Sequence, residues 1–342
     1  MFKSIKINNL RVITELEIDN FGQINVLVGH NSCGKTTLLE GLFFLIGATN
    51  PKLPVNANIF RELHYLSNQL WLTYFHNLEP NIPVEIVGKL SDTGESQSLV
   101  INPLMKESDA SQAPATASLT HTYVNGLELT YESSKEPGEK KVSTIVLEKD
   151  RLITAGTEDR PVRGIFVNPY TIADWANRFD AIQNQPDGIT KLVSLLHEIE
   201  PSLSDLRLNK DGVLLAKRGA GRLIPATLLG GGIVKFLSVG LAMLDSRDGI
   251  VLIDEIENGL DYKAQDKLWE AILSWARELN VQVFATTHSR ECIRAFNACA
   301  ESTLFESEVK LYRIERKDEK FRAVDYTKNM LAESLESDWE VR

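Results

Sequence analysis

The hydrophobic and polar positions along the chain predict an α/β pattern at both of its ends. Residues 24–28 form an almost uninterrupted apolar run, which is typical of a strand in a parallel sheet, and a helical pattern begins at about Lys35. After residue 230 the pattern again alternates between helix and strand. The elements expected there are a helix at 233–245, a strand at 250–254, a helix at 262–279, a strand at 281–286, a helix at 289–299 and a strand at 309–315.

The middle of the chain has a different pattern. Short alternating runs over 82–150 indicate strands, and the pair Asn125-Gly126 between two such runs predicts a hairpin turn. Polar stretches at 106–118 and 132–141 are expected to be surface loops. Residues 170–200 are predicted to be helical, with one apolar face formed by Leu192, Leu195, Leu196 and Ile199.

Together these patterns predict an α/β fold with a split core. Residues 1–50 and 226–342 are expected to form this core around a mixed, mainly parallel sheet. Residues 51–225 are expected to form an inserted β-rich and helical lobe that is partly continuous with the core.

Composition and charge narrow the class of protein. The chain has 342 residues, which corresponds to roughly two domains, and is 43% hydrophobic and 25% charged, as in ordinary globular proteins. Its net charge of −10 disfavours non-specific coating of nucleic acid, although a local basic groove stays open. Three cysteines are too few for a disulfide scaffold, and the longest apolar stretch, 38–48, is far short of the ~20 residues of a membrane span. We therefore expect a soluble cytoplasmic protein.

The segment Gly29-His-Asn-Ser-Cys-Gly-Lys-Thr-Thr37 matches the phosphate-loop pattern G-x-x-x-x-G-K-[ST] between a strand and a helix. The glycines let backbone N–H groups surround an anion at a helix N-terminus. Lys35 is expected to reach the β- and γ-phosphates of a nucleotide, and the Thr36 hydroxyl to bind Mg²⁺. Cys33 is either a reactive thiol or a small residue that fits the loop. The predicted nucleotide-binding residues are Gly29, Asn31, Ser32, Cys33, Gly34, Lys35, Thr36 and Thr37.

A second acidic motif follows the apolar run 250–253. Asp254 is placed to hold Mg²⁺ and Glu255 to polarise an attacking water, since ligands bind at the carboxyl ends of strands in open α/β sheets. His288 follows the next predicted strand, where it contacts the γ-phosphate or is an ordinary structural histidine. These residues predict an ATPase, with Glu255, His288 and Lys35 as catalytic residues.

The order of the motifs resembles that of ABC-type ATPases. GHNSCGKTT, LLGGGIVKFL, VLIDEIENGLD and ATTHS stand in the order of the phosphate loop, signature, Walker B motif with D-loop, and switch histidine. The opening of the chain is similar to the soluble branch of SMC, RecF and OLD-type proteins, and IDEIENGLD and FATTHSRECIRAF look most like compact prokaryotic OLD-like ATPases. The resemblance implies an ABC-type P-loop core, ATP and Mg²⁺ as cofactors, and an ATP-stabilised homodimer.

Further site residues follow from this resemblance. Arg11 stands at the arginine of the family's N-F-R pattern, although Leu10 replaces the usual phenylalanine, and would approach the γ-phosphate. A second group would lie at the dimer site: three signature glycines that replace Ser-Gly-Gly and cap the partner's γ-phosphate, a lysine where relatives have arginine, and the D-loop aspartate. Gln69 is a candidate Q-loop residue or an exposed helix residue. The predicted dimer-site residues are Gly230, Gly231, Gly232, Lys235 and Asp261.

The leading functional hypothesis is an ATP-dependent dimeric switch for a nucleic-acid-acting partner, in anti-phage defence or DNA repair. OLD-type nucleases carry a C-terminal nuclease domain, but residues 289–342 are too few for one, so a nuclease or other effector is expected as a separate chain. Binding of nucleic acid by the chain alone is expected to be weak. Two alternatives are an ATP-binding sensor with little hydrolysis and, less favoured by the β-rich insertion, the energy subunit of a membrane transporter.

Overall fold

The computed structural model describes residues 1–63, 67–107, 122–157, 162–168, 172, 174–302, 308–327 and 330–331. At its centre lies a six-stranded sheet with the strand order β16-β15-β3-β14-β13-β9, in which every pair of neighbours is parallel except the β15–β16 hairpin. Its strands are β3 (Ile24–Val28), β9 (Gly164–Val167), β13 (Ile250–Ile253), β14 (Gln282–Thr286), β15 (Val309–Lys317) and β16 (Lys320–Tyr326).

A second, seven-stranded sheet is entirely antiparallel and has the order β2-β1-β4-β5-β6-β7-β8. This sheet explains the alternating pattern of the first half of the chain, because one of its faces packs on the interior. Its strands are β1 (Phe2–Leu10), β2 (Ile13–Ile18), β4 (Val84–Leu90), β5 (Ser96–Glu107), β6 (Thr122–Ser133), β7 (Lys140–Glu148) and β8 (Arg151–Ala155).

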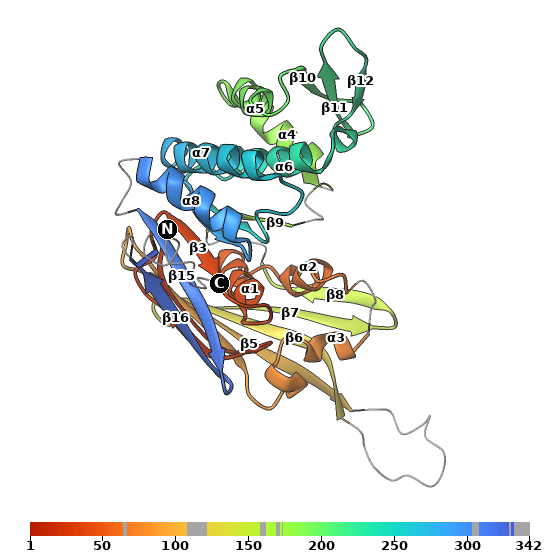
Figure 1. Cartoon of the computed structure of the whole chain (residues 1–342). Helices are drawn as coiled ribbons and strands as arrows, with labels where there is room; N and C mark the ends of the chain where they lie inside the picture. The colour runs from red at the N-terminus through yellow and green to blue at the C-terminus, as the bar shows by residue number, and fades with distance from the viewer. Residues whose placement is uncertain are drawn as a thin grey trace.

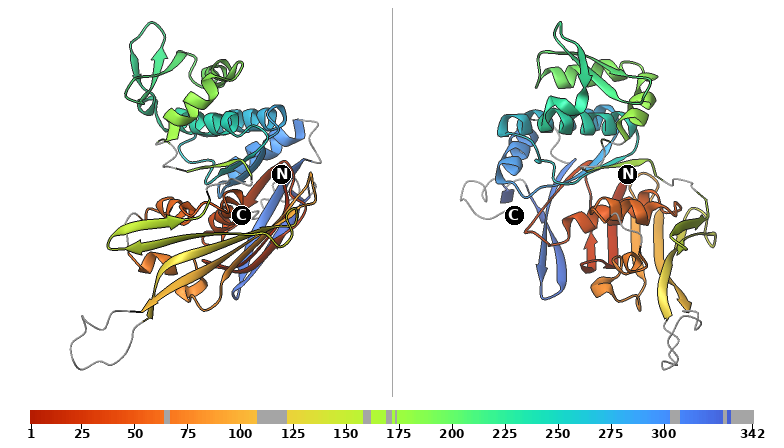
Figure 2. Two further views of the ribbon diagram at one scale, coloured as in Figure 1. Left: turned by 180° about the vertical axis from the view of Figure 1, so that it is seen from behind. Right: turned by 90° about the vertical axis from the view of Figure 1, so that its right-hand side faces the viewer.

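Helices cover both faces of the six-stranded sheet (Figures 1 and 2). The layer of α6, α7 and α8 lies on one face, and α1 lies on the other, between this sheet and the antiparallel one. No helix in the described part of the chain is both long and apolar enough to cross a bilayer. The α-helices are α1 (Lys35–Ile46), α2 (Leu53–Ile59), α3 (Gln69–Leu72), α4 (Trp175–Gln183), α5 (Gly188–His197), α6 (Gly231–Asp245), α7 (Tyr262–Glu278) and α8 (Arg290–Ser302).

The two-residue alternation of each central strand divides the interior into two cores. Val26 and Val28 of β3 pack in the core on the side of α6–α8, whereas Leu27 packs in the core shared with α1 and the antiparallel sheet. Phe284 of β14 likewise joins the core around α1, while its neighbour Val283 joins the other. Strands buried on both faces explain why these segments are apolar throughout.

A small lobe stands above α6 and α7 in Figure 1. It consists of α4, α5 and a three-stranded antiparallel sheet, and α4 and α5 both pack on α6. Leu192, Leu195 and Leu196 are buried as predicted, and Ile199 packs against them. The strands of this sheet are β10 (Leu203–Leu208), β11 (Leu214–Arg218) and β12 (Leu223–Pro225).

The predicted hairpin turn at Asn125-Gly126 is wrong. Both residues lie inside the continuous strand β6, and the register shifts there, with Gly126 opposite Leu104 and Val124 opposite Met105. Asn125 is therefore the extra residue of a β-bulge. A Cβ atom on Gly126 would lie 2.3 Å from the carbonyl oxygen of Ile145, so the glycine permits a close approach of β7 instead of a turn.

The two sheets do not follow the predicted division of the chain at residues 50 and 226. The strands β1 and β2, which we assigned to the core, belong to the antiparallel sheet because β1 pairs with β4. The short apolar strand β9, which we assigned to the inserted lobe, pairs in parallel with β13 and extends the core sheet. The polar stretch predicted at 106–118 lies mostly outside the described residues, and the one at 132–141 contains the turn between β6 and β7.

Candidate functional site

The phosphate loop connects β3 to α1 at the carboxyl end of a strand that has parallel neighbours on both sides. Gly34 has a φ of 98°, a left-handed conformation that favours glycine, and α1 begins at the next residue. Gly29 has a φ of 143°, and a Cβ atom on it would lie 2.4 Å from the carbonyl oxygen of Ile314. The loop thus requires both glycines and ends at a helix N-terminus, where anions are stabilised.

Lys35 folds back over the phosphate loop. Its Nζ atom donates hydrogen bonds to the carbonyl oxygens of Gly29, at 2.7 Å, and His30, at 2.9 Å. Asn31 and Ser32 are exposed at the same loop. The cation is therefore held where it can meet the β- and γ-phosphates of a nucleotide.

Cys33 lies beneath the loop and not at its surface. Its side chain is buried, and burial raises the pKa of the thiol even though the ammonium of Lys35 opposes this shift. A thiol with a raised pKa carries little thiolate and is a poor nucleophile. These properties favour the interpretation of Cys33 as a small residue that fits the loop.

Thr36 and Asp254 are far apart in the sequence but hydrogen-bonded in the structure. The Thr36 hydroxyl donates to Asp254 Oδ2 at 3.0 Å, and the Thr286 hydroxyl at the end of β14 donates to Asp254 Oδ1 at 2.6 Å. Burial raises the pKa of Asp254, and the two hydroxyls oppose this shift. A threonine hydroxyl and a neighbouring carboxylate can both be oxygen ligands of Mg²⁺, and phosphate oxygens can supply the remaining ligands. Sequence analysis missed Thr286.

Glu255 lies at a strained turn immediately after β13. Its φ of 47° is unusual for a residue with a side chain, and its N–H donates to the Thr286 hydroxyl at 2.8 Å. The exposed carboxylate accepts a hydrogen bond from the Asn258 amide. The structure therefore places Asp254 and Glu255 at one edge of the sheet, with Thr286 bonded to both residues.

Lys235 contacts the turn formed by Asp254 and Glu255 of its own chain. Its Nζ atom donates to the carbonyl oxygens of Asp254, at 3.1 Å, and Glu255, at 2.9 Å. Burial lowers the pKa of Lys235 to about 8. The predicted role of Lys235 at the partner's nucleotide does not match these contacts, because its ammonium is bonded to backbone oxygens of its own chain.

His288 follows β14 and pairs with a glutamate that sequence analysis missed. The backbone N–H of His288 donates to Glu257 Oε1 at 2.9 Å, and its Nδ1 lies 3.0 Å from the same oxygen. Glu257 is buried, whereas the His288 side chain is about half exposed. The carboxylate thus orients the ring through Nδ1 and leaves Nε2 for a contact with a phosphate.

Arg11 lies in a buried charge cluster near the phosphate-loop helix. Its Nε is 2.9 Å from Glu40 Oε2, and its Nη2 donates to Asn58 Oδ1 at 3.1 Å. Arg61 donates to both oxygens of Glu40, at 2.7 and 2.8 Å, and to the Thr37 hydroxyl at 3.2 Å. The arginine that contacts the phosphate loop in this structure is therefore Arg61, and Arg11 is held by Glu40.

The remaining predicted residues lie on exposed segments. Gly230, with a φ of 95°, precedes α6, and a Cβ atom on Gly231 would come within 3.7 Å of Gly259, so the signature segment packs on the D-loop of its own chain. Asp261 caps α7, because its side chain accepts a hydrogen bond from the Ala264 N–H at 3.0 Å. Gln69 is exposed on the short helix α3, which favours the helix-residue interpretation.

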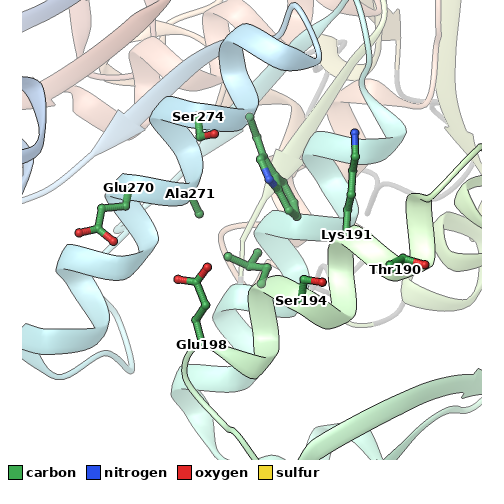
Figure 3. Close-up of a pocket in the computed structure, with 9 residues that line it drawn as sticks. Thr190, Lys191, Ser194, Glu198, Glu270, Ala271 and Ser274 are labelled. Atoms are coloured by element: carbon green, nitrogen blue, oxygen red, sulfur yellow. The ribbon is translucent and has the colours of Figure 1, made fainter. Parts of the chain in front are cut away.

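A groove of about 280 Å³ between α5 and α7 is a separate surface (Figure 3). Its lining includes the apolar side chains of Leu195 and Trp275 and the carboxylates of Glu198 and Glu270. It shares no residue with the phosphate loop, the Walker B turn or the signature segment. The groove therefore lies apart from the nucleotide site, and Lys191, which also lines it, is paired with Glu278.

Comparison with known proteins agrees with this site. A family model described as "AAA domain, putative AbiEii toxin, Type IV TA system" matches residues 24–293, a range that includes the phosphate loop, the Walker B turn and His288. The chain belongs to this AAA-domain family. It is a P-loop ATPase.

This AAA-domain ATPase is also similar to two individual proteins. An "ATP/GTP phosphatase" of Helicobacter pylori is 23% identical over 93% of this chain and 94% of its own length. An uncharacterised protein of Methanocaldococcus jannaschii is 42% identical over 48 residues, which are 14% of this chain and 22% of that protein.

Solved structures of SMC head domains share the fold. One head domain, bound to the C-terminal winged-helix domain of ScpA, is 11% identical, with 95% of this chain and 97% of that chain covered and a TM-score of 0.53. An SMC head of Pyrococcus furiosus is 9% identical, with 98% and 99% covered and a TM-score of 0.51. The predicted α/β fold with an ABC-type P-loop core is thereby confirmed.

The Lys35 contacts lead to a first testable prediction. Lys35→Ala removes a charge-assisted contact worth about 1.5–3 kcal/mol, so ATP affinity is expected to fall ~10- to 150-fold. Binding of a fluorescent ATP analogue measures this loss. Lys267→Ala, at an exposed position on α7, is the matched control and should bind like the wild type. Equal affinities of the wild type and Lys35→Ala would overturn the assignment of the phosphate loop.

Proposed function

We propose that two copies of this ATPase enclose two ATP molecules head to tail and act as an ATP-dependent switch. In this arrangement the segment 230–232 of one copy completes the nucleotide site of the other. The closed dimer controls a separate effector protein that acts on nucleic acid, such as a nuclease, in anti-phage defence or DNA repair. Nucleic acid binds only weakly to the chain itself, because its net charge is −10.

The observation that carries the dimer proposal is two exposed apolar side chains, one next to the signature segment in sequence and one next to the D-loop. Leu228 is 69% exposed and Tyr262 is 65% exposed, and they are among the most exposed large apolar side chains in the described residues. They flank in sequence the two segments that meet at Gly231 and Gly259. Exposed apolar groups around a backbone anion site are typical of a surface that a partner covers.

The chemistry follows from the positions of the site residues. Lys35 and the N-terminus of α1 would neutralise the phosphates, and Thr36 and Asp254 would hold Mg²⁺, which supplies positive charge to the phosphate oxygens. Glu255 would orient the attacking water as general base. His288, held at Nδ1 by Glu257, would face the γ-phosphate with Nε2.

The site shared between two copies is tested by mixing inactive variants. Gly231→Val should fold, because a Cβ atom there meets nothing closer than 3.7 Å within its own chain, yet its side chain would block the partner's phosphate. Glu255→Gln is defective in its own site. Neither variant should hydrolyse ATP alone, but a mixture made before ATP is added should, since a mixed dimer contains one intact site.

The mixing assay is read as single-turnover conversion of labelled ATP to ADP. A mixture of Lys35→Ala with Glu255→Gln is the matched control and should stay inactive, because both variants damage their own sites. An inactive mixture of Gly231→Val with Glu255→Gln would contradict the head-to-tail dimer.

A further inference from the structure

We infer that Lys235 is a positioning residue that fixes the orientation of Glu255 within its own chain and thereby joins the signature helix to the catalytic turn. The inference rests on the proposed function for the role of the signature segment. Lys235 lies in the second turn of α6, which begins at Gly231. Its ammonium donates to the carbonyl oxygens of Asp254 and Glu255 at 3.1 and 2.9 Å.

The backbone of Glu255 needs such support. A φ of 47° is unfavourable for a residue with a Cβ atom and persists only where neighbouring contacts fix it. Three hydrogen bonds fix it here: the Thr286 hydroxyl accepts from the Glu255 N–H, and both the Lys235 ammonium and the Asn258 N–H donate to the Glu255 carbonyl oxygen. The peptide groups on both sides of the Glu255 Cα are thus held, and the direction of the side chain is set with them.

The charges around Lys235 favour the same role. The carboxylates of Asp254, Glu257 and Glu255 all act on its ammonium. Loss of the cation would remove the donor that the described residues give the Asp254 carbonyl oxygen and would leave the Glu255 carbonyl oxygen with the Asn258 N–H alone. It would also leave three carboxylates without a shared counter-charge. The turn would then relax toward ordinary backbone angles, and Glu255 would move with it.

The helix α6 contacts the catalytic segment at two points. Gly231, at its first turn, packs on Gly259, and Lys235, one turn later, binds the carbonyls at residues 254 and 255. The helix that carries the signature segment is therefore joined to the Glu255 turn of the same chain by side-chain and backbone contacts.

The positioning role is tested with Lys235→Met and Lys235→Arg in the full chain. Lys235→Met should bind a fluorescent ATP analogue like the wild type and lose kcat by about 10- to 100-fold, since small displacements of a catalytic group have effects of this size. Lys235→Arg should recover part of kcat, because it restores a cation and donors. Lys267→Met is the matched control and should have wild-type kcat. A wild-type kcat in Lys235→Met would overturn the inference.

Mixtures of two variants distinguish an effect of Lys235 on its own chain from an effect on the partner's nucleotide. If Lys235 acts within its own chain, a mixture of Lys235→Met with Glu255→Gln stays inactive. In the mixed dimer, Glu255 is displaced in one site and replaced by glutamine in the other. If Lys235 instead contacts the partner's nucleotide, this mixture recovers hydrolysis as the mixture of Gly231→Val with Glu255→Gln does, and the inference is wrong. If the mixture of Gly231→Val with Glu255→Gln is inactive, the head-to-tail dimer is contradicted but the positioning role of Lys235 is not. The kcat of Lys235→Met then tests that role by itself.

Discussion

Glu255→Gln is expected to bind ATP with nearly wild-type affinity and to hydrolyse it about 10²- to 10⁴-fold more slowly. Its carboxylate is exposed at the carboxyl end of β13, and its side-chain hydrogen bond within the described residues is with Asn258 and not with the phosphate loop, so we expect nucleotide binding to be independent of it. Glutamine keeps the size of the side chain and can still interact with Asn258. It cannot accept a proton from water, so the general base is lost.

Phosphate release and equilibrium nucleotide binding measure the two effects of Glu255→Gln separately. Glu270→Gln is the matched control, because Glu270 is exposed on α7 and paired only with Lys267 among the contacts of the described residues. The control should hydrolyse ATP at the wild-type rate. Wild-type hydrolysis by Glu255→Gln would remove Glu255 from the catalytic site.

Glu40→Ala is expected to lower the free energy of unfolding by about 3–5 kcal/mol. Glu40 is fully buried on α1 and lies against two guanidinium groups, those of Arg11, which is 7% exposed, and Arg61. Alanine leaves both cations without their carboxylate in a site from which water is largely excluded. The loss should therefore far exceed that of an ordinary surface ion pair.

Urea unfolding of purified variants measures the effect of Glu40. Glu17→Ala is the control, because Glu17 is more than half exposed and its pairing distance to Lys6 is 3.8 Å, and it should change the free energy of unfolding by less than about 1 kcal/mol. Glu40→Gln should be intermediate, since an amide keeps the volume but not the charge. A loss below about 1 kcal/mol in Glu40→Ala would show that the cluster is not a structural ion pair.

The chemistry of the nucleotide site could be predicted because it is encoded in short segments. The two glycines of the phosphate loop adopt the positive φ values that make them necessary, and the apolar runs before the loop and before Asp254 are strands of one sheet. Once the strands are parallel neighbours, their carboxyl ends must meet at one edge. Thr36 and Asp254 are therefore in contact although their sequence positions are far apart.

The contacts that support the site could not be predicted, because they join residues without a shared motif. Glu40 lies in an apolar helical run, and nothing in the sequence pairs it with Arg61. Lys235 was matched to a relative's arginine, whereas its partners are backbone carbonyls that carry no sequence signature. The bulge at Asn125 has the same local sequence as a hairpin turn, and only the long pairing of β5 with β6 distinguishes the two.

The central claim, that ATP joins two copies of this ATPase, is tested most directly by the molar mass of Glu255→Gln in solution. Light scattering at micromolar protein with Mg²⁺ should give 38.3 kDa without nucleotide and twice that mass with ATP. The double variant Gly231→Val/Glu255→Gln should remain at 38.3 kDa in both conditions, because the signature segment can no longer meet the partner's phosphate. A Glu255→Gln protein that stays monomeric with saturating ATP, or that has the same dimer mass without it, would contradict the account.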